Sequence, residues 1–232
     1  PSLHPVSWVD GWPIVGVDGK GVVRYKKPNV GKEHPVSNFP TSDEFSNEKL
    51  GMQWGWNHNP DTLNWSLTKR SGYLRLINGK VSTNLPEAIN MLTQRPFAKY
   101  DKSLPTIGTT KVDFENIKDG DIAGLAVFQD PYAYIAVKKE NEIKKIIMVN
   151  NGEVIESTTI TSDIIFLRAI ASNSTKKASF EYSIDGKEYK KLGNELEMRF
   201  SLKIFTGNKF GLFNYATKGT GGYADFDWFK VE

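Results

Sequence analysis

Three tryptophans and a histidine lie close together in one polar stretch of this 232-residue chain. Trp54, Trp56 and Trp65 fall within the segment LGMQWGWNHNPDTLNWSLTKRSGYLRL, residues 50–76, with His58 between them. In a strand, residues two apart share a face, which would align Trp54, Trp56 and His58. An indole ring has a broad apolar face and one N–H donor. Such a row therefore either fills a core or offers a surface to a ligand with a flat apolar face.

A second aromatic pair lies in the segment QDPYAYI, residues 129–135. Tyr132 and Tyr134 alternate with Ala133 and Ile135, so a strand would place the two phenols on one face. The small apolar side suits a core, which leaves the phenols on the outer or concave face. We therefore predict that both rings are candidates for stacking and hydroxyl contacts, with Gln129 at the same strand end.

The polar candidates allow little metal or thiol chemistry. The other two histidines, His4 and His34, lie in the first forty residues, so a zinc site is not predicted and His58 is interpreted as a hydrogen-bonding residue. Zero cysteines exclude disulfides and thiol nucleophiles. Arg95, in LTQRPF, would either donate a fork of N–H groups to ligand oxygens or pair with a buried carboxylate.

The elements that must position these side chains are almost all β-strands. Alternating or β-rich runs are separated by Gly, Asn and Asp turns, and the only helix candidate is short, around residues 86–92. This pattern predicts an all-β fold, a two-sheet antiparallel β-sandwich of the jelly-roll kind. The expected strands lie within residues 72–77, 121–129, 132–139, 144–149, 164–171, 179–193, 209–217 and 222–232.

The first forty residues have a different character, with a hairpin-like VDGKGVV followed by a stretch rich in Pro, Lys and Asn. We expect residues 1–40 to form an arm or linker and residues 41–232 to form the sandwich. Because the chain opens without an initiator Met, we also expect it to be a processed product or a piece of a longer protein.

Composition limits the partners. A net charge of +3 with scattered lysines does not predict nucleic-acid binding. No apolar run approaches the roughly 20 residues that cross a bilayer. We therefore expect neither nucleic acid nor membrane as a partner, and a bacterial extracellular location rather than a cytoplasmic one.

Several motifs together resemble glycoside hydrolase family 43, which contains β-xylosidases and α-L-arabinofuranosidases. LHPVSWVDGWPIVGVDGKGVV resembles the closing strands of the family's five-bladed propeller. The remainder is similar to the C-terminal concanavalin-like sandwich of the xylan-binding type. The motifs that carry this second resemblance are SDEF, the tryptophan-rich segment above, NMLTQRPF, GLAVFQDPYAYIAV, YSIDGKEYKKLG and GYADFDWFKVE.

The resemblance implies that the catalytic carboxylates lie in the propeller, upstream of this chain, so we expect no enzyme activity from the chain by itself. Our leading hypothesis is a carbohydrate-binding module for xylan or xylo-oligosaccharides, since aromatic faces stack on the C–H face of a sugar. One rival is a structural accessory that completes the rim of the propeller's active site, and a weaker one is a hydrolase. The candidate carbohydrate-binding residues are Trp54, Trp56, His58, Trp65, Arg95, Gln129, Tyr132 and Tyr134.

The resemblance also implies a structural calcium ion. SDEF and FDWFKV resemble the two segments that together form such a site in related sandwiches. Calcium takes six to eight oxygen ligands, largely from carboxylates and carbonyls. The candidate metal ligands are Asp43, Glu44, Asp225 and Asp227.

Overall fold

The computed structural model describes residues 2–29, 31–32, 35, 40–95 and 103–232. The chain divides into two compact units, Pro1–Asn38 and Phe39–Glu232. The first unit contains a two-stranded antiparallel hairpin of β1 (Val6–Val9) and β2 (Trp12–Val15). Its turn consists of Asp10 and Gly11, both with positive φ, as a tight hairpin turn requires. The VDGKGVV segment forms only an isolated bridge between Val17 and Lys20.

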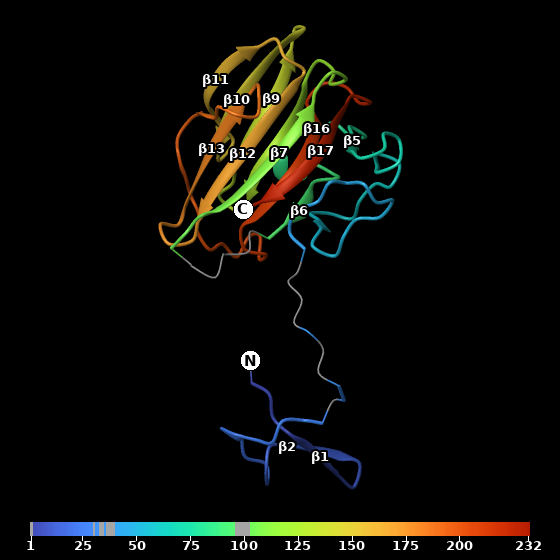
Figure 1. Ribbon diagram of the computed structural model, residues 1–232, viewed down its shortest axis with the longest axis vertical. Coiled ribbons are helices and arrows are strands. Elements are labelled where there is room, and N and C mark those ends of the chain that lie inside the picture. Colours follow the sequence, from blue (N-terminus) through green and yellow to red (C-terminus); the bar gives the residue numbers. More distant parts are fainter. Residues whose placement is uncertain (1, 30, 33–34, 36–39, 96–102) are drawn as a thin grey trace. The chain divides into compact units, whose positions relative to one another are not determined.

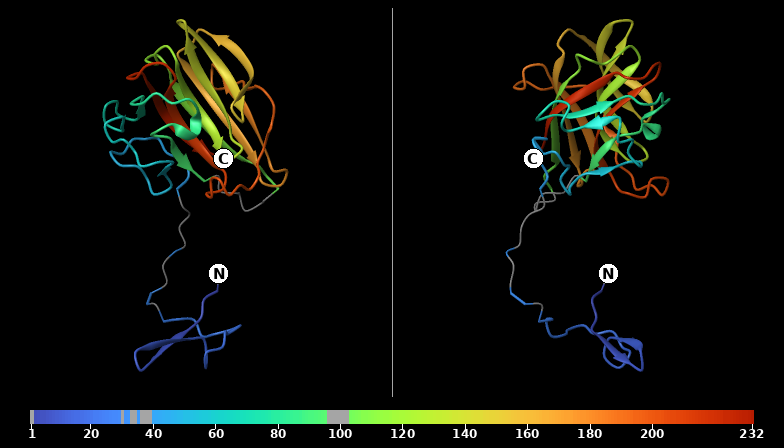
Figure 2. Two further views of the ribbon diagram at one scale, coloured as in Figure 1. Left: turned by 180° about the vertical axis from the view of Figure 1, so that it is seen from behind. Right: turned by 90° about the vertical axis from the view of Figure 1, so that its right-hand side faces the viewer.

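The second unit is a sandwich of two antiparallel sheets that lie one over the other (Figures 1 and 2). In the described residues, one sheet has seven strands and the other eight. The seven-stranded sheet runs in the order β11 (Glu153–Ile160), β10 (Ile143–Asn150), β9 (Ala133–Glu140), β8 (Asp121–Phe128), β16 (Lys209–Ala216), β6 (Leu92–Gln94) and β3 (Gly55–Trp56). The other runs in the order β14 (Lys190–Lys191), β13 (Lys177–Ser183), β12 (Ile164–Ser172), β7 (Thr106–Asp113), β17 (Tyr223–Val231), β5 (Leu74–Ile77) and β4 (Trp65–Ser66), with β15 (Leu196–Glu197) also paired to β13.

The main core lies between the two sheets. It consists of the side chains that alternation along each strand directs toward the opposite sheet. On β12, every second residue is buried, from Ile165 through Leu167 and Ala169 to Ala171. A β-bulge on β17 shifts its register between Phe226 and Trp228. Because a bulge adds one residue to a strand, Phe226 and Phe229 can both point into the core although they are three apart.

A second apolar cluster lies on the other face of the seven-stranded sheet. All eight residues of β8 are buried, because this sheet is covered on both faces. The covering residues include Leu85, which begins the 3₁₀ helix η1 (Leu85–Glu87), and Met91. This second layer has a direct consequence for the predicted ligand-binding tyrosines, because they point into it.

The predicted all-β sandwich is confirmed, and the long strands other than β7 and β11 fall where alternation placed them. The tryptophan-rich segment differs, because Trp56 is the only residue of the expected row Trp54, Trp56 and His58 that is in a strand. Met52 is 90% exposed, whereas Trp54 and Trp56 both pack against the main core. The Asp185–Gly186 turn belongs to a longer connection, since the pairing of β13 and β14 stops at Tyr182 and Lys190.

Candidate functional site

Trp54 lies partly buried at the edge of the core. Its ring packs between Phe45 and Phe229, with centroid distances of 5.7 and 5.4 Å. Its indole Nε1 donates a hydrogen bond of 2.7 Å to a carboxylate oxygen of Asp43. Both contacts fix the ring against the fold and leave part of one side open.

Trp56 and Trp65 contact each other and the core. Their rings are 5.0 Å apart with an interplanar angle of 52°, so they do not form one flat surface. His58 is exposed, and its Nε2 lies 2.8 Å from the carbonyl oxygen of Pro86, consistent with a hydrogen-bonding role. Trp56, His58 and Trp65 therefore hold this segment against the sandwich. Their rings do not form a flat surface on which a sugar could stack.

Tyr134 on β9 and Tyr132 just before this strand lie in the second apolar cluster, whereas Ala133 and Ile135 lie in the main core. Tyr132 is 9% exposed and Tyr134 is 4% exposed. The Tyr134 hydroxyl is 3.1 Å from that of Tyr215, and burial raises the pKa of Tyr134. Contact between a sugar and Tyr134 would therefore require displacement of the segments that cover this face.

Gln129 is also buried, and it supports a neighbouring loop. Its Nε2 donates to the carbonyl oxygen of Ile204 at 3.5 Å. Residues 199–207 form this loop between β15 and β16. The adjacent Asp130 accepts a hydrogen bond from the Ser201 hydroxyl at 3.1 Å. Gln129 is thus placed to position the loop and is not open to a ligand.

The loop 199–207 carries an exposed apolar cluster that sequence reasoning missed. Phe200, Leu202 and Phe205 are 74%, 77% and 72% exposed. The two phenylalanine rings contact each other edge to face at 5.8 Å, while Ile204 packs against the buried cluster. The alternating apolar residues in MRFSLKIF were the available signal, but that pattern resembles an ordinary strand. We call Phe200, Leu202 and Phe205 the apolar loop cluster.

Asp225 lies at the centre of an ion-pair ladder on the outer face of the eight-stranded sheet. Arg75 on β5 donates two hydrogen bonds of 2.7 Å to its carboxylate. Arg70 bridges Asp225 and Asp113, at 3.1 and 2.7 Å. The hydrogen bond to Asp225 raises the pKa of Arg75. These arginines use both oxygens of Asp225, which is 2% exposed.

The other three predicted calcium ligands also have protein partners. Asp43 pairs in a bridge with Phe229, so the first and last segments of the sandwich do meet. Its carboxylate accepts from the backbone N–H of Phe45 and from Trp54. Asp227 pairs with Lys111 at 2.7 Å, and Glu44 pairs with Lys230 at 3.5 Å.

The four carboxylates do not fit one calcium site. Calcium needs several oxygens around one point, whereas each of these carboxylates faces its own N–H donor or cation. In the described part of the chain, no group of three or more His, Asp or Glu side chains could hold a metal ion.

Arg95 lines an open groove beside Trp54. The groove has a volume of about 430 Å³. Thr93 on β6 lies in its wall, and its hydroxyl donates to the Gly55 carbonyl at 2.7 Å. The full lining is Met52, Gln53, Trp54, Gly55, Thr93, Arg95 and Lys209. Of the predicted carbohydrate-binding residues, this groove brings together only Trp54 and Arg95.

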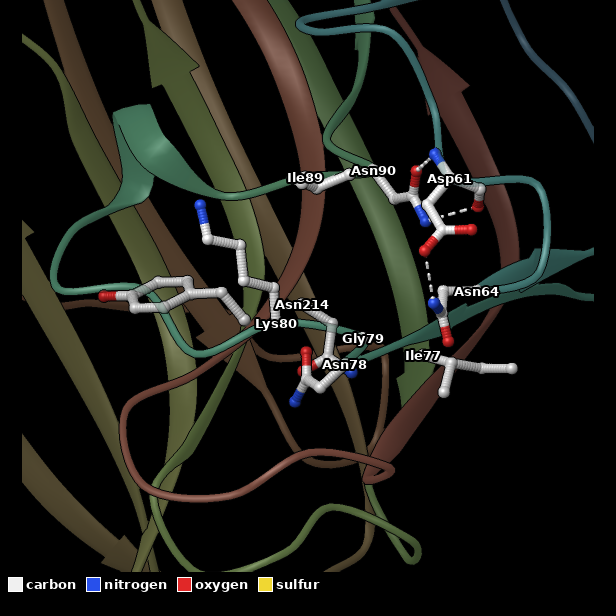
Figure 3. A pocket seen from close by; sticks show the side chains of 10 residues that line it. Asp61, Asn64, Ile77, Asn78, Gly79, Lys80, Ile89, Asn90 and Asn214 are labelled. Atoms are coloured by element: carbon white, nitrogen blue, oxygen red, sulfur yellow. Dashed lines mark hydrogen bonds between the residues drawn. The ribbon is translucent and has the colours of Figure 1, made fainter.

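A second pocket is polar and very small (Figure 3). Asn64 donates to the Asp61 carboxylate at 2.6 Å, and Asn90 pairs with the backbone of Asp61 through two hydrogen bonds. Asn78 and Asn214 also line it. Its volume of about 20 Å³ matches one water molecule. The cluster therefore holds the loop around Asp61 in place and is too small for a sugar ring.

The geometry thus defines a concanavalin-like sandwich of two antiparallel sheets. Residues 42–232 match the family described as the "Beta xylosidase C-terminal Concanavalin A-like domain" of glycoside hydrolase family 43. The chain belongs to this family. No helix among the described residues has the length and apolar character to span a membrane.

Similar proteins include two β-xylosidases by name and one solved structure named for glycoside hydrolase family 43. A β-xylosidase of Formosa agariphila is 38% identical over 99% of this chain and 42% of its own length. A putative β-xylosidase of Xylanibacter ruminicola is 31% identical over 84% of this chain and 36% of its length. The structure titled "Bifunctional GH43-CE" from Bacteroides eggerthii has a TM-score of 0.80 and 38% identity, over 100% of this chain and 30% of that one. The chain therefore spans less than half of the length of each of these three proteins.

Proposed function

We propose that the sandwich is a non-catalytic accessory domain of a family 43 xylan-degrading enzyme. In this role it packs against the catalytic domain that precedes it in the polypeptide and lends a loop to the rim of the active site. The observation that carries the proposal is the apolar loop cluster. The partial coverage of the β-xylosidase relatives agrees with it, because the rest of each relative is long enough for a catalytic domain.

The apolar loop cluster has the properties of an interface. Its three large side chains are each more than two-thirds exposed on a loop of nine residues. Exposed apolar patches rimmed by polar residues commonly mark protein–protein contacts. The loop base is held by Asp130, which also lies 3.5 Å from Lys203. An anchored base with projecting rings suits docking, because little conformational entropy remains to be lost.

The hairpin of the first unit supports the same proposal independently. Trp8 and Trp12 are 70% and 75% exposed, and an isolated two-stranded hairpin is at best marginally stable in water. These strands therefore need a further sheet or core to cover them. Because the segment resembles the closing strands of a propeller, we propose that the catalytic domain provides that cover.

Hydrogen exchange can test the docking. We would replace the aligned segment of the Formosa agariphila β-xylosidase by this chain, and compare the chimera with the chain alone. We expect the amides of residues 203–207 to exchange at least tenfold more slowly in the chimera, because a docked surface opens less often. The Phe200→Ser/Phe205→Ser chimera is the matched control and should lose this protection. Equal exchange in the chimera and the free chain would contradict docking through this loop.

A second candidate function is xylan binding by the sandwich itself. The groove beside Trp54 favours it, because a partly open indole, a guanidinium and a hydroxyl lie together there. Such a site would bind weakly, since each neutral hydrogen bond contributes only about 1 kcal/mol net. Saturable binding of xylotriose that Arg95→Gln weakens would support this candidate over docking alone.

A further inference from the structure

The groove beside Trp54 contains two cations and no lining carboxylate. The Arg95 guanidinium and the Lys209 ammonium both line it. Elsewhere on the sandwich, cations such as Arg75 and Lys111 have carboxylate partners at 2.7 Å. Within the described ranges, neither Arg95 nor Lys209 has an acidic side chain within 4.0 Å. The groove therefore carries positive charge that the described residues do not neutralise.

The two cations also act on each other. Burial lowers the pKa of Lys209, and the positive charge of Arg95 lowers it further. A like charge close to a half-buried ammonium opposes its protonation. An anion bound between the two groups would remove this repulsion, so the groove favours an anionic ligand over a neutral one.

The walls of the groove restrict the shape of that ligand. Met52 and the open part of Trp54 give one side an apolar surface. Thr93 also lines the groove, but it is buried and its hydroxyl is bonded to the Gly55 carbonyl. At about 430 Å³, the groove lies in the range of small-molecule sites. A bare inorganic anion would leave the apolar wall unused, whereas a pyranose places its C–H face there.

We propose that this groove binds a uronic acid, a sugar whose ring carries a carboxylate. Arg95 would hold the carboxylate with two parallel N–H···O bonds, Lys209 would supply the second charge, and Trp54 with Met52 would cover one ring face. The ligand class is thus a sugar unit that carries a carboxylate on its ring. This site is separate from the apolar loop cluster and does not depend on docking.

The matched ligands are methyl glucuronoside and methyl glucoside, which differ only by a carboxylate in place of a hydroxymethyl group. We would titrate both into the ¹⁵N-labelled chain and follow the amides of Gly55 and Thr93. We expect the glucuronoside to bind at least about tenfold more tightly, because hydrogen bonds to charged groups are stronger than neutral ones. Added salt should weaken its binding, since the groove is open to solvent.

Charge-neutralising variants locate the site. Arg95→Gln and Lys209→Gln should each weaken glucuronoside binding by about tenfold. Lys187→Gln removes one exposed charge from the β13–β14 connection and should leave the affinity unchanged. No binding of the glucuronoside, equal binding of the two glycosides, or identical affinities in all three variants would overturn the proposal. None of these outcomes depends on loop 199–207, so the docking proposal is judged separately.

Discussion

Replacing Asp225 by Asn should lower the free energy of unfolding by about 3 kcal/mol, because it leaves two arginines without their shared counter-charge. Arg75 makes a bidentate contact with Asp225, and Arg70 joins it to Asp113. Loss of one member of a buried ion pair costs about 3–5 kcal/mol. The lower end applies here, since Arg70 is about one-third exposed and solvent can partly compensate its charge. Urea unfolding followed by circular dichroism measures the change.

Asp227→Asn is the matched control for this effect. Asp227 lies on the same strand and pairs with Lys111 at the same distance of 2.7 Å, but both members of this pair are more exposed than Arg75 and Asp225. Exposed pairs contribute about 0–1 kcal/mol, so we expect a loss below about 1 kcal/mol. Equal losses in the two variants would show that burial does not set the strength of this ladder.

Trp54→Ala should destabilise the sandwich by about 3 kcal/mol. Truncation of a buried Trp typically costs 3–5 kcal/mol, and a partly open ring falls at the lower end. The variant also removes one of the N–H donors to the Asp43 carboxylate. The measurement is again the urea midpoint, taken with the slope of the transition to show that two-state unfolding is preserved.

Met52→Ala provides the control for Trp54. Met52 is exposed beside the same groove, and surface substitutions usually stay within about 0.5 kcal/mol. If Trp54→Ala left the free energy of unfolding unchanged, packing of the ring between Phe45 and Phe229 would not stabilise the fold. The main role of Trp54 would then be contact with a ligand.

Alternation along the chain is enough to predict the sandwich and most of its long strands. The β12 segment shows why, since Ile165, Leu167 and Ala169 recur at the strand period of two and are buried in turn. The exceptions among the long strands are β7 and β11, neither of which was predicted from the sequence. The central residues of β7 include Gly108 and Thr110, which lack the apolar alternation that marks a strand.

The candidate site was less predictable, because periodicity gives faces without showing what covers them. Tyr134 lies on the predicted face but beneath a second layer that includes Leu85 and Met91. Hydrogen-bond partners that are distant in sequence, such as Arg75 and Asp225, cannot be predicted from periodicity either. In both cases, tertiary contacts determine whether a ring or a carboxylate is free to bind.

Catalysis by the chimera tests most directly the proposal that the sandwich acts through contact with a catalytic domain. We predict that the chimera of this chain with the Formosa agariphila β-xylosidase hydrolyses an aryl xyloside, and that Phe200→Ser/Phe205→Ser lowers its kcat/KM about tenfold or more, because misplaced active-site elements cost activity steeply. Both substitutions lie on an exposed loop, so the unfolding midpoint should stay the same. Unchanged kcat/KM in the double variant would contradict the account.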